Sequence, residues 1–307
     1  MNISDALSNA IPVAFRPFLQ EVGRLASHHK QEAVLVGGVV RDLLMGRPIR
    51  DVDVMVDHPA GPIVAGLKER FNADVTTHER FMTFSLRLPS GEKIDVTTAR
   101  EERYAAPAQL PNVTPSVISA DLKRRDFSVN AIACSLLPSS LGEVMDPFQG
   151  GRDISAKQIK TLHSRSFQDD PTRLFRAARF AGRFSFTLEP ATQQQAIDAI
   201  RGKFPERLSA TRLRHEFELI LKESNPAPAL ALLGQWGLLP FLCPDWVFSD
   251  AHRRSLLCVE APVVDRALFV SRLAAWFSPW GQAKAREMMT SLGFERETKQ
   301  EVLARLS

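Results

Sequence analysis

Cysteine is scarce in this sequence. The three cysteines, Cys134, Cys243 and Cys258, are odd in number, far apart and without the spacing of metal ligands. This pattern excludes a disulfide framework and a zinc site, and it favours reduced, buried thiols.

Long apolar runs and targeting signals are also missing. No stretch approaches the roughly 18 apolar residues that a membrane-spanning helix needs. The N-terminus lacks the basic start and continuous apolar core of a signal peptide. These absences predict a cytoplasmic protein with no membrane partner. No repeat or low-complexity segment is found, and the apolar helices predicted after Pro226 carry no chemical motif, in particular no His-Asp dipeptide of a metal phosphohydrolase.

What remains is an ordinary globular composition. The 307 residues are 44% hydrophobic and 24% charged, which allows more than one domain and a sizeable core. A net charge of +4 and a pI near 9.1 are compatible with a nucleic-acid partner without establishing one.

The stretch from Leu35 to Val56 is the richest in chemical signals. It predicts a strand, a glycine turn, a short helix and a second strand. At Gly37 and Gly38 the absence of a Cβ lets backbone N–H groups approach a ligand, a geometry that suits phosphate. Asp51 and Asp53 alternate with valine, so they project from the same face of the second strand.

Two adjacent carboxylates are costly without a cation, and their hard oxygen atoms suit Mg²⁺. A lone Asp-x-Asp is more often a solvated strand face. The glycine pair and Arg41-Asp42 just upstream change the balance, because a phosphate cradle, a cation and metal ligands then converge. We therefore expect Asp51 and Asp53 to bind metal, and Gly37, Gly38 and Arg41 to bind a nucleotide.

The pattern GG-x-VRD followed by D-V-D resembles the head of the tRNA nucleotidyltransferase and poly(A) polymerase family, in its bacterial class II form. Further matches extend the resemblance from about residue 34 to about residue 221. It implies an α+β fold, with a nucleotidyltransferase palm built as a small mixed sheet with helices, then an all-α neck and body. We accordingly expect a head at residues 1–165, a neck at 166–223 and a body at 224–307 with a short or absent tail.

A third acidic residue follows on a predicted hairpin. Residues 80–88 and 93–98 read as strands that bring Asp95 back toward the first two carboxylates. Alone, Asp95 would be an exposed strand-end acid; the resemblance implies that it binds metal or helps to deprotonate the attacking hydroxyl. Residues 100–115, rich in Pro and Ala, resemble the family's flexible loop near the nucleotide, or form an ordinary surface connection.

Residues 121–133, DLKRRDFSVNAIA, match the family's RRDF-x-x-NA motif. Arg124 and Arg125 offer guanidinium groups that fit phosphate and ribose oxygens, and Asp126 and Asn130 can orient them or the sugar hydroxyls. A salt-bridged strand entry is the alternative. With the upstream motif present, we expect nucleotide contacts from Arg125 and Asn130.

After a turn near residue 146, residues 154–162 are expected to return to the sheet and end the head. A helix is then predicted from Asp170 to Arg183, with acids and Pro171 in its first turn. We expect its apolar side to pack, and Arg176 and Arg179 to lie with Arg183 on a basic side that faces nucleotide, RNA or solvent.

Asp170 and Arg173 stand one helical turn apart. As a surface ion pair they would contribute ~0–1 kcal/mol. The family's E-D-x-x-R motif has this spacing, and the resemblance implies a protein template that matches the Watson–Crick edges of cytosine and adenine. Asp169 replaces the usual Glu, which leaves the template pair intact. Arg212 and Glu216 resemble the family's helix-turn motif and predict a brace for the template helix.

The expected function is the template-independent addition of C and/or A, the CCA end, to the 3′ end of tRNA from CTP and ATP, with Mg²⁺ as cofactor and pyrophosphate as product. Three alternatives stay open: CC-only, A-only or poly(A) addition within the family, a catalytically silent RNA-binding relative, and nucleotidyl transfer to a small molecule or a protein. The intact acidic set argues against the silent relative, and the arginine row does not fit the third alternative. The oligomeric state is left open by the sequence.

Overall fold

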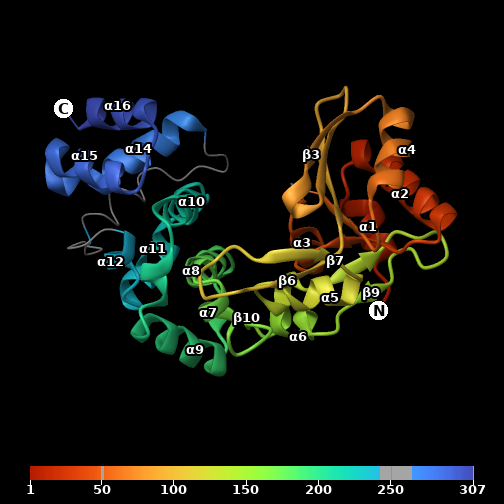
Figure 1. Ribbon diagram of the computed structural model, residues 1–307, viewed down its shortest axis with the longest axis horizontal. Helices are drawn as coiled ribbons and strands as arrows, with labels where there is room; N and C mark the ends of the chain where they lie inside the picture. Colours follow the sequence, from red (N-terminus) through yellow and green to blue (C-terminus); the bar gives the residue numbers. More distant parts are fainter. Residues whose placement is uncertain (50–51, 243–249, 251–264, 307) are drawn as a thin grey trace. The chain divides into compact units, whose positions relative to one another are not determined.

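The computed structural model describes residues 1–49, 52–242, 250 and 265–306, and within them the chain forms two compact units (Figure 1). The first unit comprises Met1–Ala105, Leu110–Ala156 and Lys160–Leu162. The second comprises Ala106–Gln109, Lys157–Ile159 and His163–Ser307. The first unit carries a mixed sheet with helices and the second is mainly helical, so the predicted α+β fold class is confirmed.

The first unit is built on a seven-stranded sheet of order β3-β4-β5-β2-β1-β8-β9. Every pairing in it is antiparallel except that of β2 with β5, which is parallel. The strands are β1 (Ala33–Val36), β2 (Asp53–Val56), β3 (Asp74–His78), β4 (Thr83–Arg87), β5 (Lys93–Thr98), β8 (Ala133–Ser135) and β9 (Val144–Met145). The predicted hairpin around Asp95 is therefore present as β4 and β5, with β4 starting three residues later than expected.

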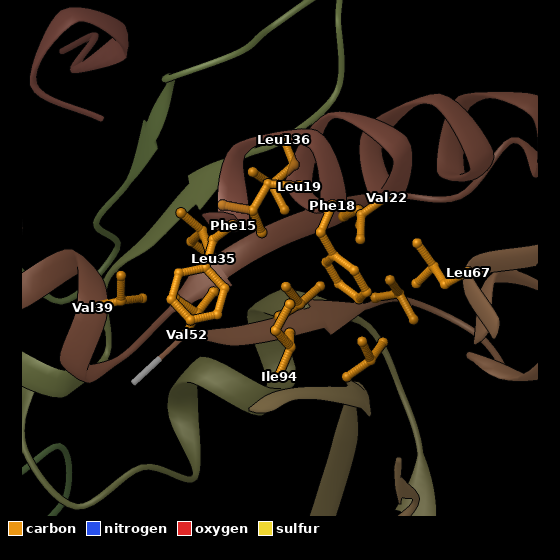
Figure 2. Close-up of a cluster of buried hydrophobic side chains, with 14 of the residues drawn as sticks. Phe15, Phe18, Leu19, Val22, Leu35, Val39, Val52, Leu67, Ile94 and Leu136 are labelled. Atoms are coloured by element: carbon orange, nitrogen blue, oxygen red, sulfur yellow. The ribbon is translucent and has the colours of Figure 1, made fainter. Parts of the chain in front are cut away.

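The apolar sides of helices such as α2 (Arg16–His29) pack against the sheet of the first unit. The helices of the first unit are α1 (Ser4–Ala10), η1 (Val13–Phe15), α2 (Arg16–His29), α3 (Gly38–Leu44), α4 (Gly61–Phe71), η2 (Glu79–Phe81), α5 (Ile118–Lys123), η3 (Ser128–Asn130) and α6 (Gly150–Ser155). Figure 2 shows Phe18 and Val22 of α2 in one cluster with Leu35 of β1 and Ile94 of β5, and all four are fully buried. Burying each such side chain contributes about 1.5–3 kcal/mol.

The two ends of residues 100–115 are paired strands, so the expectation that the whole stretch is a loop was wrong. The strands β6 (Arg100–Arg103) and β7 (Asn112–Pro115) pair antiparallel in a sheet of their own (Figure 1). Each strand of this hairpin pairs through four residues, and the Pro- and Ala-rich composition of the stretch gives little sign of strands. The tip residues Ala106–Gln109 cluster with the second unit.

Residues 154–162 do not return to the seven-stranded sheet, which corrects a second expectation. Asp146 accepts hydrogen bonds from the N–H groups of Gly150 and Gly151 at the start of helix α6, which continues to Ser155 and so overlaps the beginning of the expected strand. The strand β10 (Gln158–Ile159) then pairs in parallel with β11 (Thr187–Leu188) in the second unit.

The second unit is a stack of helices. They are α7 (Ser166–Asp169), α8 (Thr172–Phe184), α9 (Pro190–Arg201), η4 (Phe204–Arg207), α10 (Ala210–Leu221), α11 (Ala227–Gln235), α12 (Leu239–Leu242), α14 (Arg266–Phe277), η5 (Ser278–Trp280), α15 (Gly281–Ser291) and α16 (Arg296–Arg305). Helices α8 and α11 pack closely at Gly182, where an added Cβ would lie 2.7 Å from the backbone N of Ala229. No helix in the described ranges is long and apolar enough to cross a membrane.

A buried guanidinium joins α14 to the end of α10. Arg272 is fully buried and donates to the carbonyl oxygens of Leu221, Glu223 and Ser224 at 2.6–2.9 Å. The last carbonyls of a helix have no partner within the helix, so Arg272 supplies the donors that this end needs.

Replacing Arg272 with methionine should lower the free energy of unfolding of the second unit by roughly 2–4 kcal/mol, because buried carbonyls lose their donors. All four tryptophans lie after residue 235, so tryptophan fluorescence during urea unfolding reports on this unit. Arg266→Met is the matched control, since Arg266 lies on the same helix in a half-exposed ion pair with Glu301. Equal urea midpoints for the two variants would show that the hydrogen bonds of Arg272 do not stabilise this unit.

Candidate functional site

Two carboxylates of the first unit lie opposite each other on neighbouring strands. Asp53, at the start of β2, is paired in register with Asp95 of β5, so both side chains project from the same face of the sheet. The next residues along, Val54 and Val96, are buried on the other face. Asp51 lies outside the described residues, so the predicted trio is represented here by Asp53 and Asp95.

Asp95 is held by neighbours that the sequence analysis did not single out. The hydroxyl of Ser85 donates to Asp95 Oδ1 at 2.6 Å, and Lys93 Nζ lies 3.2 Å from Oδ2. Ser85 is also the register partner of Asp95 in β4. The register of β4 and β5 was the signal that could have identified Ser85.

The glycine turn lies where it was predicted, between β1 and α3. Gly37 has φ +73°, a left-handed conformation that favours glycine. A Cβ at this position would also lie 2.7 Å from Nη1 of Arg125. The turn therefore brings the backbone close to the guanidinium that was expected to bind a nucleotide.

Arg41 and Asn130 are connected beneath this turn. Arg41 is 4% exposed, and its Nη1 donates to Oδ1 of Asn130 at 2.5 Å. Asn130 in turn donates through Nδ2 to Asp126 at 2.9 Å. Both the oxygen and the nitrogen of the Asn130 amide are hydrogen-bonded to protein groups. This arrangement allows Asn130 to hold the guanidinium of Arg41 in place.

Both arginines of the RRDF motif donate to the carboxylate of Asp121, a residue that the sequence did not single out as a partner. Asp121 is fully buried and accepts hydrogen bonds from Arg124 and from Arg125. The carboxylate of Asp126 caps the N–H group of Phe127 and binds Asn130. The i, i+3 and i, i+4 spacings from Asp121 were the signal for this arrangement.

In the second unit, Asp170 borders a cavity of about 450 Å³ between α8 and α10. Its Oδ1 accepts from Arg212 Nη2 at 2.7 Å and from the N–H and hydroxyl of Thr172. Every hydrogen bond that the described residues make to this carboxylate ends on Oδ1. Oδ2 accepts none of these hydrogen bonds, and the cavity that Asp170 lines has the size of a small-molecule site.

Arg173 and Asp169 flank Asp170 with different environments. Arg173 is 5% exposed, and its Nη1 donates to the hydroxyl of Ser166 at 2.7 Å. The carboxylate of Asp169 lies 3.5 Å from Arg165 in an i, i+4 ion pair.

The arginine row of α8 does not form one exposed basic side, which corrects that expectation. Arg179 is 7% exposed and lies 3.5 Å from the carboxylate of Glu223, which also binds Arg183. Arg176 is half-buried and borders the cavity of Asp170. The sequence spacing placed the row correctly, but it did not reveal that Glu223 follows α10 and neutralises part of it.

The predicted brace is built differently from the i, i+4 pair that was expected. Arg212 reaches across to Asp170 and to the carbonyl of Ala108 at 2.6 Å. Glu216 is 5% exposed, and within the described part of the chain its Oε2 has no hydrogen-bond partner. Burial raises the pKa of the Glu216 carboxyl above its ordinary value, although Arg176 and Arg179 nearby act in the opposite direction.

This shift predicts a pH dependence of stability. A raised pKa means that the folded state binds the proton of Glu216 more tightly than the unfolded state, so the contribution of Glu216 to the free energy of unfolding falls as pH rises above the ordinary carboxyl value of 4.5. The Glu216→Gln variant lacks this contribution. The free energy of unfolding of the variant minus that of wild type should therefore increase with pH through this window and then level off. Urea unfolding at several pH values measures it, and a difference that is constant or decreases with pH would contradict the assignment.

Comparison with known proteins now identifies the family. Residues 33–160 match the family described as "Poly A polymerase head domain", and residues 185–248 match "Probable RNA and SrmB- binding site of polymerase A". The CCA-adding enzyme of Geobacillus thermodenitrificans is 32% identical over 291 residues, which cover 86% of this chain and 67% of that protein. The chain belongs to the tRNA nucleotidyltransferase and poly(A) polymerase family. The resemblance seen in its motifs is confirmed.

Solved structures of this tRNA nucleotidyltransferase family share the fold. A CCA-adding enzyme in an apo form gives a TM-score of 0.84 at 33% identity and covers 98% of this chain and 73% of its own. The Thermotoga maritima CCA-adding enzyme complexed with tRNA gives 0.81 at 30% identity, covering 98% and 72%.

Other relatives of this tRNA nucleotidyltransferase family are matched over less of their length. The A-adding enzyme of Geobacter sulfurreducens is 36% identical over 75% of this chain, and the CC-adding enzyme of Deinococcus radiodurans is 35% identical over 74%. The chain spans 26% and 60% of these two proteins, respectively.

Proposed function

We propose that this chain adds C and/or A nucleotides, without a nucleic-acid template, to the 3′ end of tRNA. The observation that carries the proposal is the head site: a glycine turn in contact with Arg125 on the same unit that pairs Asp53 with Asp95. Family relatives named A-adding, CC-adding and CCA-adding enzymes support this class of reaction.

In the proposed reaction the 3′ hydroxyl oxygen of tRNA attacks the α-phosphorus of CTP or ATP, and its proton passes to Asp95 or to water. The bond from that phosphorus to the β-phosphate oxygen breaks, and pyrophosphate leaves with the electron pair. Arg125 binds phosphate or ribose oxygens through its forked guanidinium, and the turn at Gly37 leaves room for a phosphate against the backbone. Arg41 contributes positive charge from below the turn and is kept in place by Asn130.

The donor set of the head fits Mg²⁺. Asp53 and Asp95 offer hard carboxylate oxygens on one face, and the like charges so close together favour a cation between them. The described residues contain no group of three His, Cys, Asp or Glu side chains for a metal, and Asp51, the remaining predicted ligand, lies outside them. Bound there, Mg²⁺ would activate the attacking hydroxyl and neutralise charge on the leaving pyrophosphate.

We propose that base choice comes from the second unit, through Asp170 and Arg173. Asp170 lines the cavity of about 450 Å³, and Arg212 and Thr172 hold its carboxylate through Oδ1. A carboxylate accepts from the exocyclic amine that cytosine and adenine both carry, and a guanidinium donates to ring acceptors.

The deciding experiment incubates the protein with tRNAs that lack A, CA or CCA, with labelled CTP or ATP and Mg²⁺. Incorporation on all three substrates indicates CCA addition, and incorporation of one nucleotide alone indicates the CC-only or A-only reaction. Long adenosine tracts indicate poly(A) addition. A protein that binds these tRNAs and incorporates nothing is a silent relative, and a protein that neither binds nor extends them refutes the proposal.

The domain scheme also stands as a proposal, with a head at residues 1–165, a neck at 166–223 and a body at 224–307. The cytoplasmic location stays a prediction. Limited proteolysis with mass analysis of the fragments would test the boundaries, because cleavage concentrates at exposed connections between domains.

A further inference from the structure

One charged network in the first unit goes beyond the residues that the proposed reaction uses. We propose that Asp121 is a positioning residue for nucleotide binding, which acts by holding the guanidinium of Arg125 against the glycine turn. The inference rests on the proposed function, because it assigns Arg125 the nucleotide contact.

Asp121 is a fully buried carboxylate on α5 with an unusual number of donors. Its Oδ2 accepts from Arg124 Nε at 3.0 Å, from Arg124 Nη2 at 2.7 Å and from the N–H group of Arg100 at 3.1 Å. Its Oδ1 accepts from Arg125 Nη2 at 3.2 Å. A buried carboxylate needs such donors to compensate for its loss of water. Both oxygens of Asp121 are hydrogen-bonded, by the two motif arginines and one backbone N–H group.

The contacts of Arg125 fix the direction in which its guanidinium points. Nη2 is bound by Asp121, and Nη1 lies 3.5 Å from the carbonyl of Asn130 and against Gly37. The side chain is 21% exposed, so part of the group remains open to a ligand. A guanidinium fork that is held at one end delivers its other donors in a single orientation, and less side-chain entropy is lost when a ligand binds.

Glu102 extends the network to the hairpin of β6 and β7. Its Oε1 accepts from Arg124 Nη1 at 2.5 Å and lies 3.4 Å from Arg100 Nη2, and its Oε2 accepts from the hydroxyl of Tyr104. Arg124 therefore joins the two carboxylates, and it leaves Asp121 Oδ1 to Arg125. This division of labour explains why two successive arginines are needed: the first completes the buried network and the second faces the turn.

The test is a double-mutant cycle with Asp121→Asn and Arg125→Met, read out by binding of ATP and CTP and by KM and kcat for their addition to tRNA. Asp121→Asn should weaken nucleotide binding about tenfold, the size expected for one lost charged hydrogen bond. The change should appear mainly in KM, and tRNA affinity should stay the same. Because Asp121 acts through Arg125, the double variant should bind no more weakly than Arg125→Met alone.

The control is Asp74→Asn, the same chemical change at an exposed position of β3 in the same unit. It should bind nucleotide as the wild type does. Circular dichroism checks that every variant is folded. If Asp121→Asn does not fold, Arg125→Lys replaces it in the test, since lysine keeps the charge but cannot hold Asp121 and a nucleotide at once; its affinity should also fall about tenfold.

Unchanged nucleotide affinity in folded Asp121→Asn, or multiplied losses in the double variant, would overturn the positioning role. Wild-type affinity in Arg125→Lys would do the same. A wild-type protein that binds ATP or CTP but extends no tRNA refutes the proposed reaction alone, and the binding cycle still decides the role of Asp121. A wild-type protein that binds neither nucleotide overturns both.

Discussion

Asp53→Ala is expected to abolish nucleotide incorporation while the protein stays folded and still binds tRNA. Asp53 pairs with Asp95 on one sheet face, where together they supply the carboxylate oxygens proposed for Mg²⁺. Metal stabilisation of the transferring phosphate amounts to several kcal/mol. Losing about 4 kcal/mol of it corresponds to a drop in kcat of roughly 10³-fold.

The fold should tolerate this change, and the two effects can therefore be separated. Asp53 is exposed, and like charges directly opposite on neighbouring strands destabilise a sheet. Removing one of them should change the free energy of unfolding by no more than about 0.5 kcal/mol. Asp51→Ala is expected to behave in the same way, and Asp74→Ala, on an outer strand of the same sheet, is the control that should stay active.

Single-turnover incorporation of labelled nucleotide on a truncated tRNA measures the effect, with tRNA binding and circular dichroism as parallel readouts. Near-normal turnover by both Asp51→Ala and Asp53→Ala in folded proteins would show that these carboxylates do not carry the chemistry. If the wild type stays active after divalent ions are chelated, the proposed dependence on a metal ion is wrong.

Local backbone signals in the head were sufficient to predict its central elements. The glycine turn at Gly37 follows from the end of an apolar run, and it was found with a left-handed φ that glycine adopts most readily. The hairpin that carries Asp95 was also predicted from local pattern, and the resemblance to the family placed Asp95 near Asp53, 42 residues earlier. The structure adds that the two residues are register partners on neighbouring parallel strands.

Features that depend on distant partners could not be predicted in this way. Glu223 lies 40 residues after Arg183, and only the packed structure shows that it neutralises Arg183 and Arg179. Asp121 and Glu102 are brought together on Arg124 from different elements. Periodicity predicts the face of a helix on which a charge lies, but it does not predict which opposite charge meets that face.

The predicted brace between α8 and α10 illustrates the same limit within one motif. The sequence paired Arg212 with Glu216, four residues away, because that spacing puts both on one side of a helix. In the structure Arg212 instead binds Asp170, which lies 42 residues earlier. Arg212 therefore contacts the carboxylate that is proposed to read the base. The orientation of Asp170 depends on residues of both α8 and α10.

Asp170→Asn is expected to erode the discrimination against UTP and GTP more than it lowers binding of the correct triphosphate. With Oδ1 taken by Arg212 and Thr172, Oδ2 is the atom that can accept from the amine of cytosine or adenine. Uracil and guanine present a carbonyl at that position, so the carboxylate would face another acceptor. Such a mismatch costs about 1–3 kcal/mol, or roughly 5- to 150-fold in selectivity.

An asparagine at position 170 can offer either an N–H group or a carbonyl at the Oδ2 position, because its side-chain amide carries both. The variant should therefore accept the wrong bases without losing the shape of the cavity. Asp198→Asn is the matched control, since Asp198 lies on α9 of the same unit, hydrogen-bonded only to the exposed side chain of Gln194 among the side chains described. The measurement is the relative incorporation of all four nucleotides by wild type and both variants on one truncated tRNA. If folded, active Asp170→Asn keeps wild-type selectivity, Asp170 is structural and the base is read by other residues.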